Sequence, residues 1–177
     1  MNSDYKNPFG KFNGKEAEYA LRALDSETPE NKNFPWVQKF EEAFSAGIGA
    51  KYAIAVNSGT SGLHAALYAA GVDVGDEVIQ PATTVVMDAY VTMHLGGVPV
   101  FVDICPKSWN IDATKIEEKI TERTKAIIVV SLYGLPVDID PILEIASKYN
   151  LTVIDDSHRT AALALQGPNS RKILNSI

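Results

Sequence analysis

The sequence predicts an α/β protein, with a mainly parallel sheet flanked by helices. From Lys51 onward, short apolar runs alternate with helical patterns, which is typical of strand–helix–strand units. Runs such as AIIVV at 126–130 are apolar without alternation, as expected for strands that helices cover on both faces. No internal repeat or low-complexity linker divides the chain, so we expect a single domain.

The first 50 residues predict two surface helices on either side of a polar, proline-containing break. In residues 14–24, alanine and leucine recur at helical spacing, and charged residues occupy the opposite face. In residues 36–44, aromatic and aliphatic side chains repeat this spacing. We expect each helix to pack through one face.

The remaining chain predicts strands that alternate with helices. The expected strands are 52–56, 77–80, 98–104, 124–132 and 151–156. The expected helices are 61–71, 85–96, 113–120 and 140–149. Asp88, Asp112 and Asp140 lie near the starts of the last three helices, where an acidic side chain is favourable as a cap or in the first turn.

Composition excludes several function classes. Of the 177 residues, 16 are Lys or Arg and 22 are Asp or Glu, for a net charge of −6, which argues against a nucleic-acid partner. No apolar stretch approaches the roughly 18 residues of a membrane span, and the N-terminus is too polar for a signal peptide. The single cysteine, Cys105, excludes an internal disulfide and a multi-cysteine zinc site. We expect a cytoplasmic protein without a metal site or a membrane partner.

Ligands of open parallel sheets collect at the carboxyl ends of the strands. The small-residue turn 57–62 follows the first expected strand and opens a helix. Its backbone N–H groups and the hydroxyls of Ser58, Thr60 and Ser61 suit a phosphate without any lysine. A tight turn with a Ser/Thr cap explains these residues equally well. The turn matches neither a P-loop nor a dinucleotide fingerprint.

Two more segments follow expected strands. The loop Pro81–Val85 could cover a flat ring, although its composition favours an apolar loop that seals the sheet. Asp155 and Asp156 end the last strand, and such a pair is costly unless one carboxylate meets a cation. This cation could be a protonated pyridine nitrogen, a metal ion or a basic side chain. His158, by itself, is best explained as an ordinary loop histidine.

Three other chemically active side chains have no evident role. His64 and His94 fall in expected helices with no partner in the sequence pattern. We expect Cys105 to be a loop or packing residue, because no neighbouring feature of the sequence suggests a lowered thiol pKa.

Residues 51–104 and 110–156, together with 36–44, carry several motifs in a recognisable order. They include NSGTSGLHAAL, QPATTVV, VPVFVDI, LYGLPVD and VIDD. The chain resembles, over roughly residues 8–156, the DegT/DnrJ/StrS family of pyridoxal-phosphate (PLP) dependent sugar aminotransferases. The resemblance implies the aspartate aminotransferase-like fold, PLP-dependent fold type I, with residues 1–156 forming the N-terminal part of an incomplete large domain.

The resemblance also implies the cofactor contacts. Gly59 and Thr60 match the pair that contacts the cofactor phosphate, with Ser61 beside them. Asp156 aligns with the carboxylate that keeps the pyridine nitrogen protonated, so that the ring acts as an electron sink. Val85 lies at the position where many family members place an aromatic ring against the cofactor. Valine cannot stack on the cofactor ring, so the resemblance implies only an apolar contact there.

Other matches are less direct. His158 falls in the segment where the family has a glutamine or histidine near the cofactor's 3-hydroxyl. Asp103 and the Tyr133–Gly134 pair match recurrent positions, for which we expect an architectural role.

The resemblance weakens after Asp156. The family continues to a phosphate-binding serine and to the lysine that forms the Schiff base. In this chain the only lysine after Asp156 is Lys172, and its surroundings do not match. We therefore expect residues 157–177 to be a divergent tail. The Schiff-base lysine is then missing and the chain has no transaminase activity by itself.

The origin of this tail has three explanations. Codons for residues 165–172 can be chosen so that a one-base shift reads YKDRIAG, which is close to the family's YKGR followed by glycine. A shifted reading frame, a plain truncation and a divergent end all remain open, and the downstream DNA distinguishes them.

The implied function is amino transfer to a nucleotide-linked keto sugar in polysaccharide biosynthesis, with glutamate as the usual donor and a homodimer as the family assembly. One alternative is a PLP-dependent sugar dehydratase of the same family, which shares the retained motifs. A non-catalytic remnant that binds a partner is another alternative. A flavodoxin-like signalling domain fits less well, because its acidic pocket belongs on an earlier strand.

Overall fold

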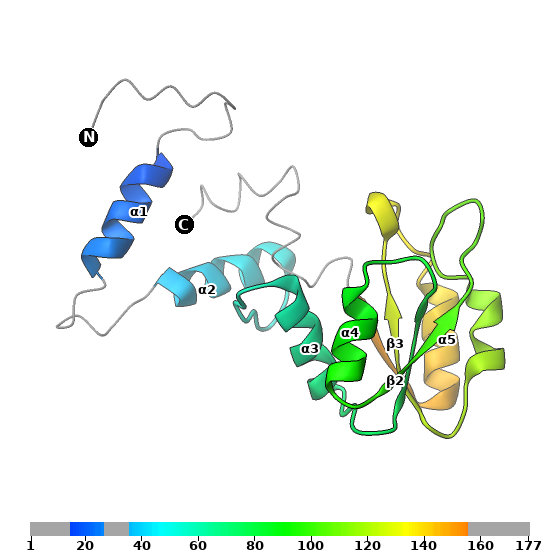
Figure 1. Ribbon diagram of the computed structural model, residues 1–177. Helices are drawn as coiled ribbons and strands as arrows, with labels where there is room; N and C mark the ends of the chain where they lie inside the picture. Colours follow the sequence, from blue (N-terminus) through cyan, green and yellow to red (C-terminus); the bar gives the residue numbers. More distant parts are fainter. Residues whose placement is uncertain (1–14, 27–35, 156–177) are drawn as a thin grey trace. The chain divides into compact units, whose positions relative to one another are not determined.

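The computed structural model describes residues 15–26 and 36–155 (Figure 1). The chain divides between Ala55 and Val56 into two compact units. The first unit holds the described helices α1 (Lys15–Ser26) and α2 (Trp36–Ile48). The second unit holds the sheet and the remaining helices.

The first unit confirms both helices expected at the N-terminus. On α2, Phe44 is buried and its ring lies 6.0 Å from the ring of Phe40. This contact supports the expected packing face of α2. On α1, Leu21 and Leu24 are 43% and 66% exposed, so among the described residues that helix buries little of its apolar face.

The second unit is built on a four-stranded parallel sheet. Its strands are β1 (Glu77–Pro81), β2 (Val98–Val102), β3 (Thr124–Val129) and β4 (Thr152–Asp155). The spatial order is β2-β1-β3-β4, and every pairing is parallel. The predicted fold class is therefore confirmed.

Helices cover both faces of this sheet (Figure 1). Helices α3 (Gly59–Ala69) and α4 (Met87–His94) pack on one face, and α5 (Asp140–Tyr149) packs on the other. None of the described helices is long and apolar enough to cross a lipid bilayer.

The strands contribute to two hydrophobic clusters, one on each face. In β1, Val78 packs with α3 and α4, whereas the next residue, Ile79, packs with α5. Both side chains are fully buried. Because successive side chains of a strand point to opposite faces, a strand covered on both sides has to be apolar throughout, which explains runs such as 126–130.

The segment 52–56 does not form the expected strand. Tyr52 and Ile54 are 75% and 79% exposed, and the backbone N–H of Ala55 donates to the Glu41 carboxylate at 2.7 Å. A strand exists only when its backbone pairs with another strand, and no described strand pairs with this segment. The prediction of a strand there was wrong for that reason.

The segment 113–120 is also different from its prediction. It forms two short 3₁₀ turns, Ala113–Lys115 and Glu117–Lys119, instead of one α-helix. The expected cap is confirmed, because Asp112 accepts a hydrogen bond from the Thr114 backbone N–H at 3.1 Å. Ile116 is fully buried between the turns and anchors the segment to the core.

A buried polar cluster ties β1 to the turn before β3 at the amino ends of both strands. Glu77 is only 5% exposed. Its carboxylate accepts a hydrogen bond from the Thr121 hydroxyl at 2.6 Å and pairs with the Arg123 guanidinium. The Thr121 hydrogen bond and the Arg123 charge outweigh burial and lower the pKa of Glu77.

Candidate functional site

The turn before α3 is organised by its own side chains. Ser58 has extended backbone angles, and its Oγ accepts a hydrogen bond from the Ser61 backbone N–H at 3.2 Å. The Ser61 hydroxyl donates to the Asn57 side-chain oxygen at 2.6 Å. This is an N-cap geometry, and it holds the first turn of α3 in place without a ligand.

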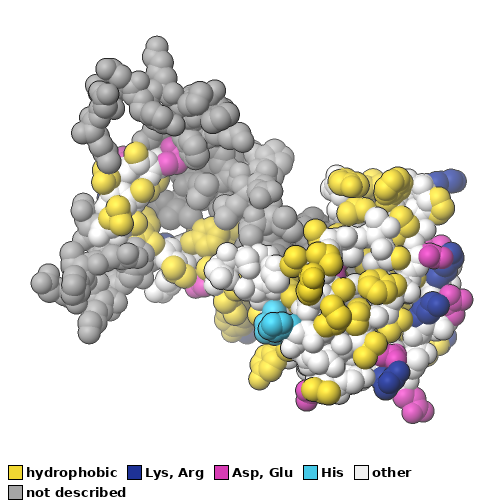
Figure 2. Space-filling model, in the orientation of Figure 1, with side chains coloured by type: hydrophobic (Ala, Val, Ile, Leu, Met, Phe, Trp, Pro, Cys, Tyr) yellow, Lys and Arg dark blue, Asp and Glu magenta, His cyan; other side chains and the backbone are white. Residues whose placement is uncertain are grey.

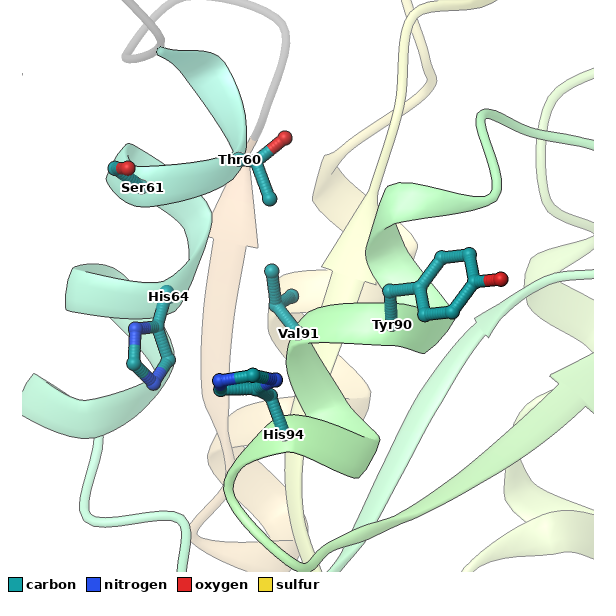
Figure 3. A pocket seen from close by; sticks show the side chains of 6 residues that line it. All are labelled: Thr60, Ser61, His64, Tyr90, Val91 and His94. Carbon is teal, nitrogen blue, oxygen red and sulfur yellow. The ribbon is translucent and has the colours of Figure 1, made fainter. Parts of the chain in front are cut away.

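The first turn of α3 presents the groups that an anion requires. N–H groups at the start of a helix have no acceptor within the helix and point outward from its end. Figure 3 shows the Thr60 hydroxyl directed away from α3 on the side of α4, with Ser61 on the other side of the helix. Thr60 is exposed, whereas Gly59 and Ser61 are half-buried.

A cavity of about 230 Å³ lies between α3 and α4 (Figure 3). The side chains that line it come from both helices: Thr60, Ser61, His64, Tyr90, Val91 and His94. It is open to solvent on one side, where Figure 2 shows histidine surface next to hydrophobic side chains. The cavity begins at the expected phosphate-binding residues and continues along the two helices.

The cavity brings together two histidines that the sequence pattern left without partners. The ring centroids of His64 and His94 are 5.5 Å apart, and the rings meet edge to face at 85°. His64 lies one helical turn after Thr60, so helical spacing predicts that the two share a face of α3. The position of His94 beside them depends on how α4 packs, which spacing within one helix does not reveal.

Val85 lies in the loop between β1 and α4. Its side chain is 54% exposed, at the end of the sheet where parallel strands end. The loop starts with a hydrogen bond from the Ala82 backbone N–H to the Val102 carbonyl at 2.8 Å, which continues the pairing of β1 with β2. An exposed apolar side chain is therefore held at the edge where a flat ring would need one.

Asp88 has a different environment from the one expected for a residue at a helix start. It lies in the first turn of α4, but its side chain is fully buried. The Thr84 hydroxyl donates to its Oδ2 at 2.7 Å. Burial raises the pKa of Asp88, and the Thr84 hydrogen bond offsets only part of that rise.

The acidic strand end is described only in part. β4 ends at Asp155, and Asp156 and His158 lie outside the described residues. Ile154 packs against the cluster that contains Leu63 of α3, so the end of β4 lies beside α3 (Figure 3). The roles predicted for Asp156 and His158 stay predictions.

Cys105 lies in a loop, as expected, but its thiol pKa differs from the prediction. The backbone N–H groups of Lys107 and Ser108 hydrogen-bond to its thiol and lower its pKa. A tight turn at 105–109 supplies these donors, since the Trp109 N–H donates to the Cys105 carbonyl.

In the described part of the chain, no three metal-ligating side chains lie together.

Asp103 lies in the connection that follows β2. Its carboxylate accepts a hydrogen bond from the Lys115 ammonium at 2.9 Å, which lowers the pKa of Asp103. Its carbonyl accepts a hydrogen bond from the Asp112 N–H at 3.0 Å. Both contacts hold the segment after β2 to the 3₁₀ turns, in keeping with the architectural role expected for Asp103.

The residues described here suit PLP. A capped helix N-terminus with an exposed hydroxyl fits a phosphate, and an exposed apolar side chain at the same edge of the sheet fits the face of a ring. These features need no lysine or arginine at the phosphate.

Comparisons with known proteins show the family of this chain. Residues 12–173 match the DegT/DnrJ/EryC1/StrS aminotransferase family. The chain is 42% identical over 160 residues to GDP-perosamine synthase of Caulobacter vibrioides, an alignment that covers 90% of this chain and 43% of that protein. The chain thus spans less than half the length of this relative.

Two solved structures share the fold. NtdA of Bacillus subtilis with bound cofactor PMP has a TM-score of 0.73 and 40% identity, covering 81% of this chain and 33% of that one. GDP-4-keto-6-deoxymannose-3-dehydratase with a trapped PLP-glutamate geminal diamine has a TM-score of 0.73 and 28% identity, covering 85% of this chain and 40% of that one. PLP is the family's cofactor. The chain belongs to the DegT/DnrJ/EryC1/StrS aminotransferase family and corresponds to the N-terminal portion of its PLP-dependent members.

Proposed function

We propose that this chain is the N-terminal part of an aminotransferase that acts on a nucleotide-linked keto sugar, with PLP as cofactor and glutamate as amino donor. The observation that carries the proposal is the capped N-terminus of α3, which presents outward N–H groups and the Thr60 hydroxyl at the carboxyl edge of a parallel sheet. Similarity to GDP-perosamine synthase supports a nucleotide sugar as the substrate.

The phosphate of the cofactor is bound at the start of α3. The N–H groups of Gly59 and Thr60 and the Thr60 hydroxyl donate to its oxygens. Ser61 contributes less, because its hydroxyl already donates to Asn57 at 2.6 Å and has to leave that acceptor before it can donate elsewhere. The positive end of the helix dipole favours the phosphate charge.

The ring is held by the loop and the strand end. Val85 contacts one face through apolar surface alone. Asp156 holds the pyridine nitrogen in its protonated form through a charge-assisted hydrogen bond, and His158 lies near the 3-hydroxyl. When bound, the cofactor supplies an electron sink for bonds broken at the amino-donor carbon.

Residues 1–156 form part of the large domain, and residues 157–177 form a divergent tail. Lys172 does not act as the Schiff-base lysine, so the 177 residues bind the cofactor without transferring amino groups. In the complete enzyme the active sites lie between two identical subunits. The cytoplasm is the compartment expected for a chain with Cys105 as its single cysteine.

Binding is tested with pyridoxamine 5′-phosphate (PMP), because PMP has no aldehyde to react with surface lysines. We expect saturable PMP binding by calorimetry, and no binding of pyridoxamine without its phosphate. Thr60→Ala should weaken PMP binding about tenfold, in line with the loss of one hydrogen bond to a charged group. Ser147→Ala, at an exposed position of α5 on the other face of the sheet, is the matched control. Equal affinity of PMP and pyridoxamine would refute the phosphate assignment.

Turnover is tested separately. The purified chain with PLP, glutamate and a GDP-linked keto sugar should form no 2-oxoglutarate above a protein-free blank. Robust turnover would overturn the proposal that the chain lacks its catalytic lysine.

Similarity to a dehydratase structure favours sugar dehydration as the second candidate. Loss of a hydroxyl group from the keto sugar with no nitrogen incorporated into the sugar product, in the complete protein, would select it.

A further inference from the structure

A partly buried polar contact joins the loop of Val85 to α4. Thr84, the residue before Val85, donates its hydroxyl hydrogen to Asp88 Oδ2 at 2.7 Å. One turn further along α4, the Thr92 hydroxyl donates to the Asp88 backbone carbonyl at 2.9 Å. Asp88 and Thr92 have no exposed surface. The Asp88 side chain therefore links the loop at the candidate cofactor site to the helix beneath it.

Two buried side-chain oxygens in the described part of the chain have no hydrogen-bond partner, Asp88 Oδ1 and Gln80 Oε1. An unsatisfied buried polar group costs about 1–3 kcal/mol, and an unsatisfied carboxylate oxygen costs more. Most buried polar groups of folded proteins are hydrogen-bonded, so each of these two oxygens calls for a specific explanation. Both oxygens are acceptors as long as Asp88 is ionised, so they cannot pair with each other in that state.

Both side chains occupy the same layer of the fold. Val78 of β1 packs in the cluster formed with α3 and α4, and Ile79 packs on the opposite face. Since strand side chains alternate, Gln80 points to the α3–α4 side. Asp88 lies three residues before Val91, which packs in that same cluster, so helical spacing directs Asp88 toward the sheet.

Among the residues that the structure describes, no charged side chain offsets the burial of Asp88. The elements that pack around it carry few titratable groups: His64 and Tyr68 on α3, Tyr90 and His94 on α4, and Glu77 on β1. β2 carries none. Glu77 lies at the amino end of β1 and pairs with Arg123, and none of these groups shifts the pKa of Asp88, which burial raises.

We propose that Asp88 carries a proton on Oδ1 and donates it to Gln80 Oε1, so that Thr84, Asp88 and Gln80 form one buried hydrogen-bonded chain. A single proton then satisfies both unpaired oxygens. These hydrogen bonds connect β1, α4 and the loop 81–86, and they make Asp88 a positioning residue for Val85. This last point rests on the proposed cofactor site.

Ionisation of Asp88 has a defined consequence. Loss of the proton removes the donor to Gln80 and leaves a buried negative charge, so the loop and the first turn of α4 become less stable. The Asp88 contribution to stability is complete below its ordinary pKa of 3.8 and is lost as the pH rises through its higher pKa in the folded chain.

The protonation state is measured without any cofactor. We expect the side-chain carboxyl ¹³C signal of Asp88 to show a protonated acid well above pH 3.8, and the infrared band of a protonated carboxyl to disappear in Asp88→Asn. Asp138→Asn, at an exposed position, should leave that band unchanged. An Asp88 signal that titrates at or below 3.8 would overturn the proposal, because Asp88 would then be ionised and the Gln80 amide group would have to face it with its N–H.

The pairing with Gln80 is measured by a double-mutant cycle. Asp88→Asn keeps a donor and an acceptor, so it should retain the stability that the parent has at a pH below the raised pKa of Asp88. Asp88→Leu and Gln80→Met each remove one member of the pair. We expect their effects on the folding equilibrium constant to differ from additivity by about tenfold. Strict additivity would contradict the pairing.

The link to the candidate site is measured by PMP affinity against pH. In the parent chain, affinity should fall as the pH rises through the pKa of Asp88, beyond any change that PMP itself causes. In Asp88→Asn, PMP affinity should not show this fall. Equal pH profiles would refute the positioning role. Absence of PMP binding in both proteins would refute the proposed function, while the carboxyl signal would still decide the state of Asp88.

Discussion

The side chain of Asn110 accepts a hydrogen bond from the backbone N–H of Leu132 at 3.1 Å. The same amide group donates to the carbonyls of Leu135 and Pro136, each at 3.1 Å. Asn110 is only 4% exposed, and its partners lie in the loop that follows β3. One side chain therefore holds three backbone groups of a loop at the edge of the sheet where ligands of such folds bind.

Asn110→Leu should destabilise the chain by about 2–4 kcal/mol, because it leaves buried backbone groups of that loop without partners. Urea unfolding followed by circular dichroism measures the change. Gln38→Ala, on the exposed side of α2, should change stability by less than about 0.5 kcal/mol. An equal effect of the two substitutions would show that the Asn110 contacts contribute little.

The Glu77 cluster should make stability depend on pH. Because Thr121 and Arg123 lower the pKa of Glu77 in the folded chain, its contribution is present above the ordinary value of 4.5 and is lost as the pH falls through the lowered value. Glu77→Gln should destabilise the chain at neutral pH and reduce the loss of stability on acidification. Unfolding free energies between pH 3 and 7 test this, and parallel curves for parent and variant would contradict it.

Val85→Phe should strengthen PMP binding if Val85 lies against the cofactor ring as proposed, because an aromatic side chain would stack on the ring face. An aromatic pair contributes about 0.5–1.5 kcal/mol beyond its buried area, so the affinity should rise roughly threefold to tenfold. Val37→Phe on α2, where Val37 is 52% exposed, is a control of similar exposure. Unchanged affinity in Val85→Phe would place Val85 away from the ring.

Gly96 and Gly47 should respond oppositely to alanine. Gly96 has φ +79°, and an added Cβ would lie 2.8 Å from Val74 Cγ2. Gly96→Ala should therefore destabilise by more than about 1 kcal/mol. Gly47 lies in α2 with no atom within 4 Å of an added Cβ, so Gly47→Ala should stabilise by about 0.5–1 kcal/mol. Thermal unfolding of both variants measures these changes, and an unchanged or higher melting temperature for Gly96→Ala would refute the strain at Gly96.

Features that depend on the local pattern were predicted well. Apolar runs located β1 to β4, helical spacing located α1 to α5, and the small-residue turn at 57–62 located the capped start of α3. The family resemblance, which rests on ordered motifs, was confirmed by the match over residues 12–173.

What the sequence by itself determined is the parallel α/β architecture, the family and the position of the small-residue turn that caps α3, because each depends on residues close together in the chain. Only the tertiary structure decided that no described strand pairs with 52–56, that His64 meets His94, and that Asp88 is buried with one side-chain oxygen unpaired. These outcomes depend on which elements pack together, since pairing, burial and desolvation are properties of distant neighbours and not of local spacing.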